Sequence, residues 1–224
     1  MRAVVFDLFG TLLDNLEPEG WKAAFSEIAV HLGADPDKFW EGWVAGYSSR
    51  MDGSLPDNDH VFAPIASALG LQVGDAELRD AARMRDRFMR SCMRIKHDAL
   101  TCLEALSARG YQLALATDCS SQTPSLLDET PLGAFFETRA ISAELGVTKP
   151  HPAMYEHVLA GLGVSGDQCW YVGDGNSHEL VGAKRHGMTT VWVDNADRQF
   201  HRERFSPEGD HTIRQLNDLL DLVP

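Results

Sequence analysis

The sequence predicts an α/β fold, with a Rossmann-like parallel sheet as its core and an inserted α-helical cap domain. Short apolar runs alternate with helix-like segments over the second half of the chain. Such runs are typical of strands buried on both faces, and their alternation with helices is typical of a parallel sheet. A long helix-like stretch after the first run interrupts this pattern and predicts the insertion.

The apolar runs define the expected elements of the core. Five of them are expected to be strands: Ala3–Phe9, Gln112–Asp118, Thr138–Ser142, Cys169–Asp174 and Thr189–Asp194. Between the later strands, Met154–Leu162 and Glu179–His186 fit helices, and Gly187 is placed to cap the second one. The segment Asp210–Leu220 is expected to pack against the core and to supply no catalytic group.

The cap is expected to cover residues 16–96, and the core domain residues 1–15 and 97–224. Apolar residues recur at helical spacing at Trp21, Phe25, Ile28 and Leu32. The amphipathic run Leu78–Met93 predicts a second long helix. Its arginines between Arg83 and Arg90 are interleaved with aspartates and are expected to form a solvated face. Three aromatic residues at helical spacing are expected either in the core of the cap or on the face of the cap that packs on the core domain: Trp40, Trp43 and Tyr47.

Composition restricts the class of partner. The net charge of −13 argues against nucleic acid, because phosphate backbones bind basic surfaces, whereas a small anionic substrate remains compatible with it. No apolar run is long enough to span a membrane, and no signal peptide is recognisable, so we expect a cytoplasmic protein. The four cysteines lack CxxC spacing and are expected to be free thiols. The pattern does not distinguish a monomer from a homodimer.

Four motifs fall at or just after predicted strand ends or helix starts. They are Asp7-Leu8-Phe9-Gly10-Thr11, Leu115-Ala116-Thr117-Asp118, Val147-Thr148-Lys149-Pro150 and Gly173-Asp174-Gly175-Asn176-Ser177-His178-Glu179. The carboxyl ends of parallel strands meet at one edge of a sheet, where ligands bind. A carboxylate at the end of a buried strand is costly unless it is paired, so Asp7 is expected to be a nucleophile or a metal ligand.

In this order the motifs resemble those of the haloacid dehalogenase-like hydrolase superfamily, and residues 16–96 take the place of that family's helical cap. The resemblance implies a hydrolase in which Asp7 is the nucleophile that attacks phosphorus or carbon. It implies that Thr117 hydrogen-bonds a transferring phosphoryl group and that Lys149 neutralises Asp7 and the developing charge. Asp118 stands where the family commonly has an asparagine.

The resemblance also implies a Mg²⁺ ion. Asp7, the backbone carbonyl of Phe9 and Asp174 would hold it, a ligand set of the kind magnesium prefers. Glu179 is expected to reach the metal's water shell or to hold Lys149. The residues expected to bind substrate are Phe9, Gly10, Thr11, Thr117 and Asp118.

Phe9 departs from the pattern of the family's phosphatases, which carry an aspartate there as general acid and base. Such help is worth about 10²–10⁴-fold in rate. A phosphatase without it would favour acidic leaving groups or borrow an acid from the cap, where His31, His60 and His97 are available.

Two other reactions use the same nucleophile. Family dehalogenases resemble this chain in having an aromatic residue at the Phe9 position, but they need a cap arginine. The cap sequence most similar to the one that supplies this arginine is Phe39-Trp40-Glu41, and it has a glutamate in place of the arginine. Arg50 is an alternative source of the positive charge. The family's dehalogenases also have a serine at the position of Asp174. A phosphonate C–P hydrolase would need a Schiff-base lysine in the cap, for which Lys22 and Lys38 are candidates.

Together these observations favour a Mg²⁺-dependent phosphatase that acts on a small phosphorylated metabolite through an aspartyl-phosphate on Asp7. The alternatives are a 2-haloacid dehalogenase, a C–P hydrolase, or a catalytically impaired protein that binds phosphorylated ligands. The joint presence of Asp7, Thr117, Lys149 and Asp174 argues against the last.

Overall fold

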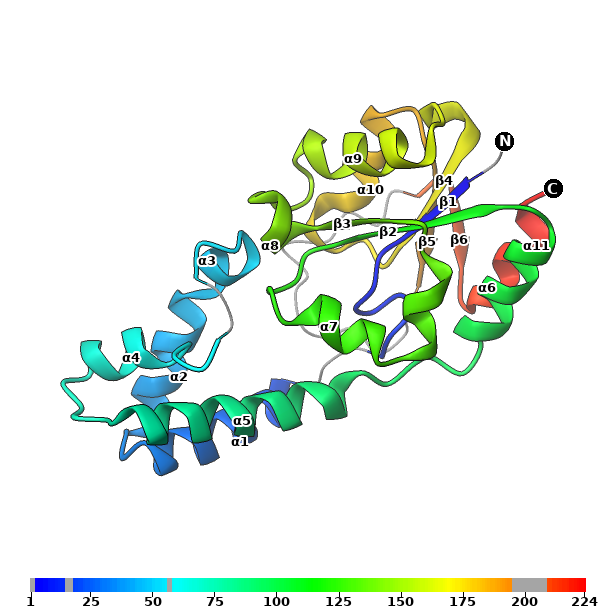
Figure 1. The fold of residues 1–224 in the computed structure, drawn as a ribbon. Coiled ribbons are helices and arrows are strands. Elements are labelled where there is room, and N and C mark those ends of the chain that lie inside the picture. The colour runs from blue at the N-terminus through cyan, green and yellow to red at the C-terminus, as the bar shows by residue number, and fades with distance from the viewer. Residues whose placement is uncertain (1–2, 15–17, 56–57, 195–208) are drawn as a thin grey trace.

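A computed structural model describes residues 3–14, 18–55, 58–194 and 209–224. Figure 1 shows a central sheet with helices on both faces and a separate group of helices to one side. The strands are β1 (Ala3–Phe6), β2 (Gln112–Thr117), β3 (Thr138–Ile141), β4 (Cys169–Gly173), β5 (Thr189–Val193) and β6 (His211–Ile213). The core helices are α6 (Ala99–Ala108), α7 (Thr123–Asp128), α8 (Ser142–Leu145), α9 (Pro152–Leu162), α10 (Glu179–Arg185) and α11 (Leu219–Leu222).

The described strands form one parallel sheet in the order β3-β2-β1-β4-β5-β6. Strand β1 lies between β2 and β4, so that Val5 is level with Ala114 and Tyr171. All four residues of β1 are buried, as expected for a strand covered on both faces. The chain order reverses on either side of β1, and this is where open α/β sheets bind their ligands. The predicted α/β fold is confirmed.

Alternate residues of each strand enter two separate cores. Val4 and Phe6 point into the cluster beneath α6 and α11, whereas Ala3 and Val5 point into the cluster beneath α9 and α10. Figure 1 shows α9 and α10 on one face of the sheet and α6 and α11 on the other. This alternation follows from the two-residue period of a strand.

Five described helices lie between β1 and α6, and all of them except α3 supply residues to a third hydrophobic cluster. They are α1 (Pro18–His31), α2 (Pro36–Ala45), α3 (Tyr47–Met51), α4 (Ala63–Ala68) and α5 (Asp75–Cys92). Phe25 is at its centre, 4.4 Å from the Trp43 ring and 6.0 Å from the Phe62 ring. Trp43 is thus in the cap core as expected, whereas Tyr47 is 43% exposed. The boundary proposed between residues 15 and 16 lies outside the described residues.

The chain enters and leaves the helical cap through two adjacent segments. Leu13 and Ile95 form an antiparallel bridge. The backbone N–H of Asp14 donates to Arg94 O, and that of Lys96 donates to Leu12 O, both at 2.9 Å. The two linkers are therefore held side by side.

The elements end close to where the sequence predicts, with one omission. Each predicted strand is one to three residues too long at its carboxyl end, and α9 begins at Pro152. Strand β6 was not predicted. Ile213, Leu216 and Leu219 join the core cluster, which confirms the expected packing of the C-terminal segment. Gly187 follows α10 with φ +78°, as its expected capping position requires.

The four cysteines are free thiols, as expected, and all are buried. In the described part of the chain, no helix combines the length and the apolar character that crossing a membrane requires.

Candidate active site

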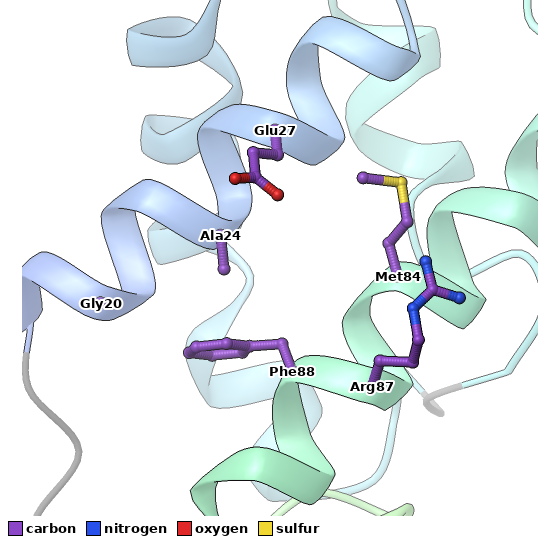
Figure 2. Close-up of a pocket in the computed structure, with 6 residues that line it drawn as sticks. All are labelled: Gly20, Ala24, Glu27, Met84, Arg87 and Phe88. Atoms are coloured by element: carbon purple, nitrogen blue, oxygen red, sulfur yellow. The ribbon is translucent and has the colours of Figure 1, made fainter.

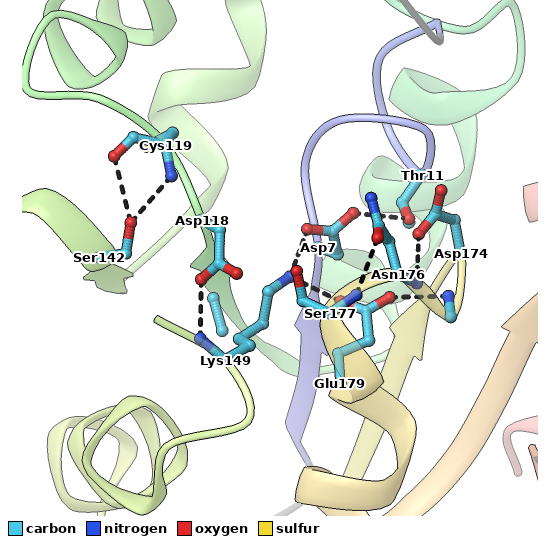
Figure 3. A network of polar contacts seen from close by, with 12 residues as sticks. Asp7, Thr11, Asp118, Cys119, Ser142, Lys149, Asp174, Asn176, Ser177 and Glu179 are labelled. Carbon is cyan, nitrogen blue, oxygen red and sulfur yellow. Dashed lines mark hydrogen bonds and ion pairs between the residues drawn. The ribbon is translucent and has the colours of Figure 1, made fainter. Parts of the chain in front are cut away.

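The carboxyl ends of β1, β2 and β4 bring the predicted motifs to one edge of the sheet (Figure 3). Asp7 follows β1, Thr117 ends β2 and Asp174 follows β4. Lys149 lies on the loop before α9, and Glu179 begins α10. All five side chains are at least nine-tenths buried. Parallel pairing thus brings together groups that lie far apart in the sequence.

Asp7 is held from two sides. Its Oδ1 lies 2.6 Å from Nζ of Lys149, and its Oδ2 accepts a hydrogen bond from Oγ1 of Thr11 at 3.0 Å. The tight turn after β1 makes the second contact possible: Gly10 has φ +83°, a region that glycine enters readily, and Leu12 N donates to Leu8 O. Thr11, which is expected to bind substrate, is fully buried, and its hydroxyl positions Asp7.

Lys149 joins two carboxylates. Its Nζ lies 2.6 Å from Oδ1 of Asp7 and 2.6 Å from Oε2 of Glu179. Burial lowers the pKa of Lys149, but the carboxylates of Asp7 and Glu179 outweigh this effect and raise it well above its usual value. The lysine therefore remains a cation next to the expected nucleophile.

Glu179 is fully buried, and both of its oxygens accept hydrogen bonds. Oε2 accepts from Lys149 and from the Tyr171 hydroxyl at 2.9 Å, and Oε1 accepts from Gly175 N at 2.9 Å. Burial raises the pKa of Glu179 to about 8, Lys149 opposes this shift, and the charges of Asp7 and Asp174 add to it. Of the two roles expected for Glu179, these contacts match the holding of Lys149. Tyr171 is a member of this network that sequence reasoning missed.

Asp7, Asp174 and Glu179 form a buried acidic cluster in which one carboxylate oxygen from each residue lies within 4.8 Å of the other two. Asp174 accepts a hydrogen bond from Asn176 N at 2.9 Å, which fixes its carboxylate at the start of the loop. Carboxylate oxygens are the ligands that Mg²⁺ prefers, so the donor set fits this ion. The two oxygens of Glu179 accept three hydrogen bonds, more than the two contacts of Asp7, so Asp7 and Asp174 are the better matched donors.

Thr117 presents a hydroxyl that the fold leaves without a partner. The residue is 1% exposed, and its Oγ1 has no hydrogen-bond partner among the described residues. Buried polar atoms are nearly always paired, so an unpaired one at a strand end indicates a place for a ligand atom. This matches the role expected from the resemblance, a hydrogen bond to a phosphoryl group.

Asp118 lies next to Thr117 and is only half-buried. Its Oδ1 accepts a hydrogen bond from the backbone N–H of Lys149 at 2.8 Å. Burial raises the pKa of Asp118, whereas Lys149 and a hydrogen bond from the Ser177 side chain oppose the shift. The carboxyl group of Asp118 is thus anchored to the backbone of the loop that carries Lys149 (Figure 3).

The other expected site residues lie at the margin. The Phe9 side chain is half-buried and packs against the core cluster. Gly10 accepts a hydrogen bond from Nζ of Lys96 at 2.6 Å through its carbonyl oxygen. The cap histidines His31, His60 and His97 are all exposed.

The cap contacts the core through an arginine that was expected to be solvated. Arg85 is 4% exposed, and its guanidinium donates to Gln122 Oε1 and to Ser120 Oγ. The amide of Gln122 in turn donates to Asp86. The expectation of a solvated arginine face is therefore wrong at Arg85, because the loop after β2 covers this part of α5.

A second cap arginine is buried nearby. Arg50 is 3% exposed, donates to Trp43 O at 2.7 Å and stacks 3.4 Å from the centre of the Trp43 ring. Arg85 lies 5.4 Å from the same ring.

Gly53, just after α3, approaches the core so closely that a Cβ there would lie 2.0 Å from Ala143 O.

A hollow of about 380 Å³ lies on the cap between α1 and α5 (Figure 2). It is lined by Gly20, Ala24, Glu27, Met84, Arg87 and Phe88. None of the residues of the acidic cluster lines it, so it is separate from the candidate active site.

Comparison with known proteins agrees with this geometry. Residues 1–187 match the family described as haloacid dehalogenase-like hydrolase. A ribulose-1,5-bisphosphate 5-phosphatase of Halopiger xanaduensis is 29% identical, with 99% of this chain and 98% of that protein covered. An (S)-2-haloacid dehalogenase of a Pseudomonas species is 24% identical, with 100% and 96% covered.

Solved structures share the fold. A 2-haloacid dehalogenase from Pseudomonas syringae superposes with a TM-score of 0.73 at 22% identity, over 99% of this chain and 97% of that one. The buried Asp7–Lys149 pair, the acidic cluster and the match over most of the sequence lead to one conclusion: the chain belongs to the haloacid dehalogenase-like hydrolase family.

Proposed function

We propose that this hydrolase is a phosphatase that cleaves the monoester of a small phosphorylated metabolite through an aspartyl-phosphate on Asp7. The observation that carries the proposal is the Asp7 carboxylate, buried beside the Lys149 ammonium at 2.6 Å and within the acidic cluster. A structural ion pair alone gives no reason for the two further carboxylates, Asp174 and Glu179, or for the unpaired Thr117 hydroxyl.

The two steps use residues already described. Oδ of Asp7 forms a bond to phosphorus while the bond from phosphorus to the leaving oxygen breaks. Water then attacks phosphorus, which releases phosphate and restores the carboxylate. Lys149 balances the charge on the transferring group, and Thr117 donates a hydrogen bond to one of its oxygens.

Magnesium fits the same cluster. Asp7 and Asp174 would hold it, together with the backbone carbonyl of Phe9, and Glu179 would keep Lys149 in place. When bound, the ion would neutralise charge on the phosphoryl oxygens. The acidic residue at position 174 is the feature that favours phosphoryl chemistry over dehalogenation.

Phosphate release in the presence of Mg²⁺, from a matched set of acyl, aryl and alkyl phosphates, tests the proposal. Asp7→Asn keeps the shape of the side chain and removes the nucleophile, so turnover is expected to vanish while the protein stays folded by circular dichroism. A charge-matched control is Asp221→Asn at the exposed end of α11, which should keep full activity. Undiminished turnover by Asp7→Asn contradicts the mechanism.

Dehalogenation is the second candidate, and one observation favours it. The cap does supply buried arginines: Arg50 and Arg85 flank the Trp43 ring, although Glu41 occupies the position first considered. Halide release from (S)-2-chloropropionate without added metal would support this reaction over phosphate hydrolysis. C–P cleavage is less well supported, because Lys22 and Lys38 are exposed and Lys22 pairs with Asp37.

A further inference from the structure

An alkoxide leaving group needs a proton as its bond to phosphorus breaks, and the side chain of Phe9 cannot give one. We infer that Asp118 delivers the proton to the leaving oxygen and takes it back from the attacking water. The inference rests on the proposed phosphatase function and assigns its missing acid.

Most ionisable groups at this edge of the sheet are committed to other contacts. Asp7 is bound by Lys149 and Thr11, and it is the nucleophile of the proposed reaction. Glu179 lies fully buried behind Lys149, with three donors on its two oxygens. Asp118, by contrast, is partly exposed, and its carboxyl group accepts from a backbone N–H of the Lys149 loop rather than from the lysine ammonium.

The location of Asp118 suits a group that meets the leaving oxygen. It directly follows Thr117, whose unpaired hydroxyl marks the phosphoryl position, and it is linked to Lys149 through the backbone. One hydrogen bond from Lys149 N and one from Ser177 fix its orientation. Asp118 is also partly exposed to solvent, unlike Asp7, Asp174 and Glu179.

The electrostatic surroundings are compatible with a protonated carboxyl group. Burial raises the pKa of Asp118, and the negative charge of Asp7 adds to this effect. The cation of Lys149 and the Ser177 hydroxyl oppose it. These are the groups that face Asp118 from the loops after β1, α8 and β4.

The protons balance over one turnover. In the first step the O–H bond of Asp118 breaks, and its proton joins the leaving oxygen as that oxygen separates from phosphorus. In the second step the Asp118 carboxylate accepts a proton from water while the water oxygen bonds to phosphorus. Asp118 ends in the form in which it began, and no other reactant is needed.

The test compares Asp118→Asn with the wild-type protein on an alkyl ester, glycerol 3-phosphate, and an aryl ester, p-nitrophenyl phosphate. The amide oxygen of asparagine can still accept the hydrogen bond from Lys149 N, so the local structure is expected to persist. Nitrophenolate is a weak base and leaves without a proton, so its first-turnover burst should change by less than about tenfold. Hydrolysis of glycerol 3-phosphate should fall by about 10²–10⁴-fold.

Each outcome is decisive. A selective loss on the alkyl ester supports the role of Asp118, whereas an equal loss on both esters indicates a structural role and overturns it. Unchanged alkyl hydrolysis by Asp118→Asn overturns it too, and so does a wild-type protein that cleaves only aryl esters, although the phosphatase function then stands. A wild-type protein that cleaves neither ester, nor an acyl phosphate, overturns the proposed function itself.

Discussion

Gly173 lies directly against Glu179: a Cβ placed on Gly173 would be 2.2 Å from Oε1 and 2.6 Å from Cδ of that side chain. The Glu179 side chain cannot move away without breaking hydrogen bonds, because Lys149, Tyr171 and Gly175 donate to its two oxygens. The last residue of β4 must therefore lack a side chain for the lysine to be held beside Asp7.

Gly173→Ala is expected to displace Glu179 and Lys149, because neither the strand nor the glutamate can yield. Activity should fall by at least about 100-fold, and overpacking should cost about 1–3 kcal/mol of unfolding free energy. Steady-state turnover and urea denaturation measure the two effects. Gly20→Ala is the matched control: a Cβ there meets nothing within 4 Å, and alanine in α1 should be neutral or stabilising. Normal activity in Gly173→Ala contradicts this account of the site.

Lys149→Met is expected to destabilise the fold as well as to abolish turnover. It leaves Asp7 and Glu179 buried together without their cation, and breaking a buried pair in this way costs about 3–5 kcal/mol. Urea denaturation at pH 7 measures the loss. Lys184→Met removes the more exposed pair with Asp210 and should cost about 0–1 kcal/mol. Similar losses in the two variants argue against a special role for the buried lysine.

Arg85→Met is expected to weaken the contact between the cap and the core. It removes the hydrogen bonds to Gln122 and to the buried Ser120, and a buried hydrogen-bonding group left unpaired costs about 1–3 kcal/mol. We expect a lower melting temperature and a changed KM. Arg83→Met, on the exposed side of the same helix, loses only a surface pair with Asp80 and serves as the control. An effect of Arg83→Met equal to that of Arg85→Met rules out this role of Arg85.

The buried cysteines are expected to resist alkylation in the native protein. Burial raises the pKa of Cys102, Cys119 and Cys169 to about 12 each. A raised thiol pKa means less thiolate, so at pH 8 only about one thiol in 10⁴ is ionised. Iodoacetamide followed by mass spectrometry should label these residues only after urea is added. Rapid labelling of the native protein at pH 8 contradicts the burial of these thiols.

The sheet core could be predicted because its strands are buried on both faces. Strands such as β1 and β4 therefore appear in the sequence as continuous apolar runs, and their carboxyl ends mark the site. Strand β6 has three residues, one of which is exposed, so no run of apolar residues identifies it.

The gathering of the motif residues at one edge of the sheet could be predicted from the sequence, but their contacts could not. Arg85 has the charge of its solvated neighbours on α5, and its partner Gln122 lies 37 residues away, so only the folded chain reveals that it is buried. In the sequence, Tyr171 resembles a core residue of β4, and its aromatic ring does pack in the hydrophobic core. Its hydroxyl nevertheless reaches Glu179, because strand alternation points Tyr171 toward the side of the sheet where α10 begins.

The paired linkers at Leu13 and Ile95 bring the two ends of the helical insertion next to each other. An insertion whose ends adjoin can be lengthened, shortened or exchanged for another without altering the register of the sheet. Asp7 and Lys149 lie outside that insertion, so a change to the inserted helices does not change these two residues. Replacing one contiguous stretch of the gene could therefore exchange the whole helical insertion and leave the buried Asp7–Lys149 pair unchanged.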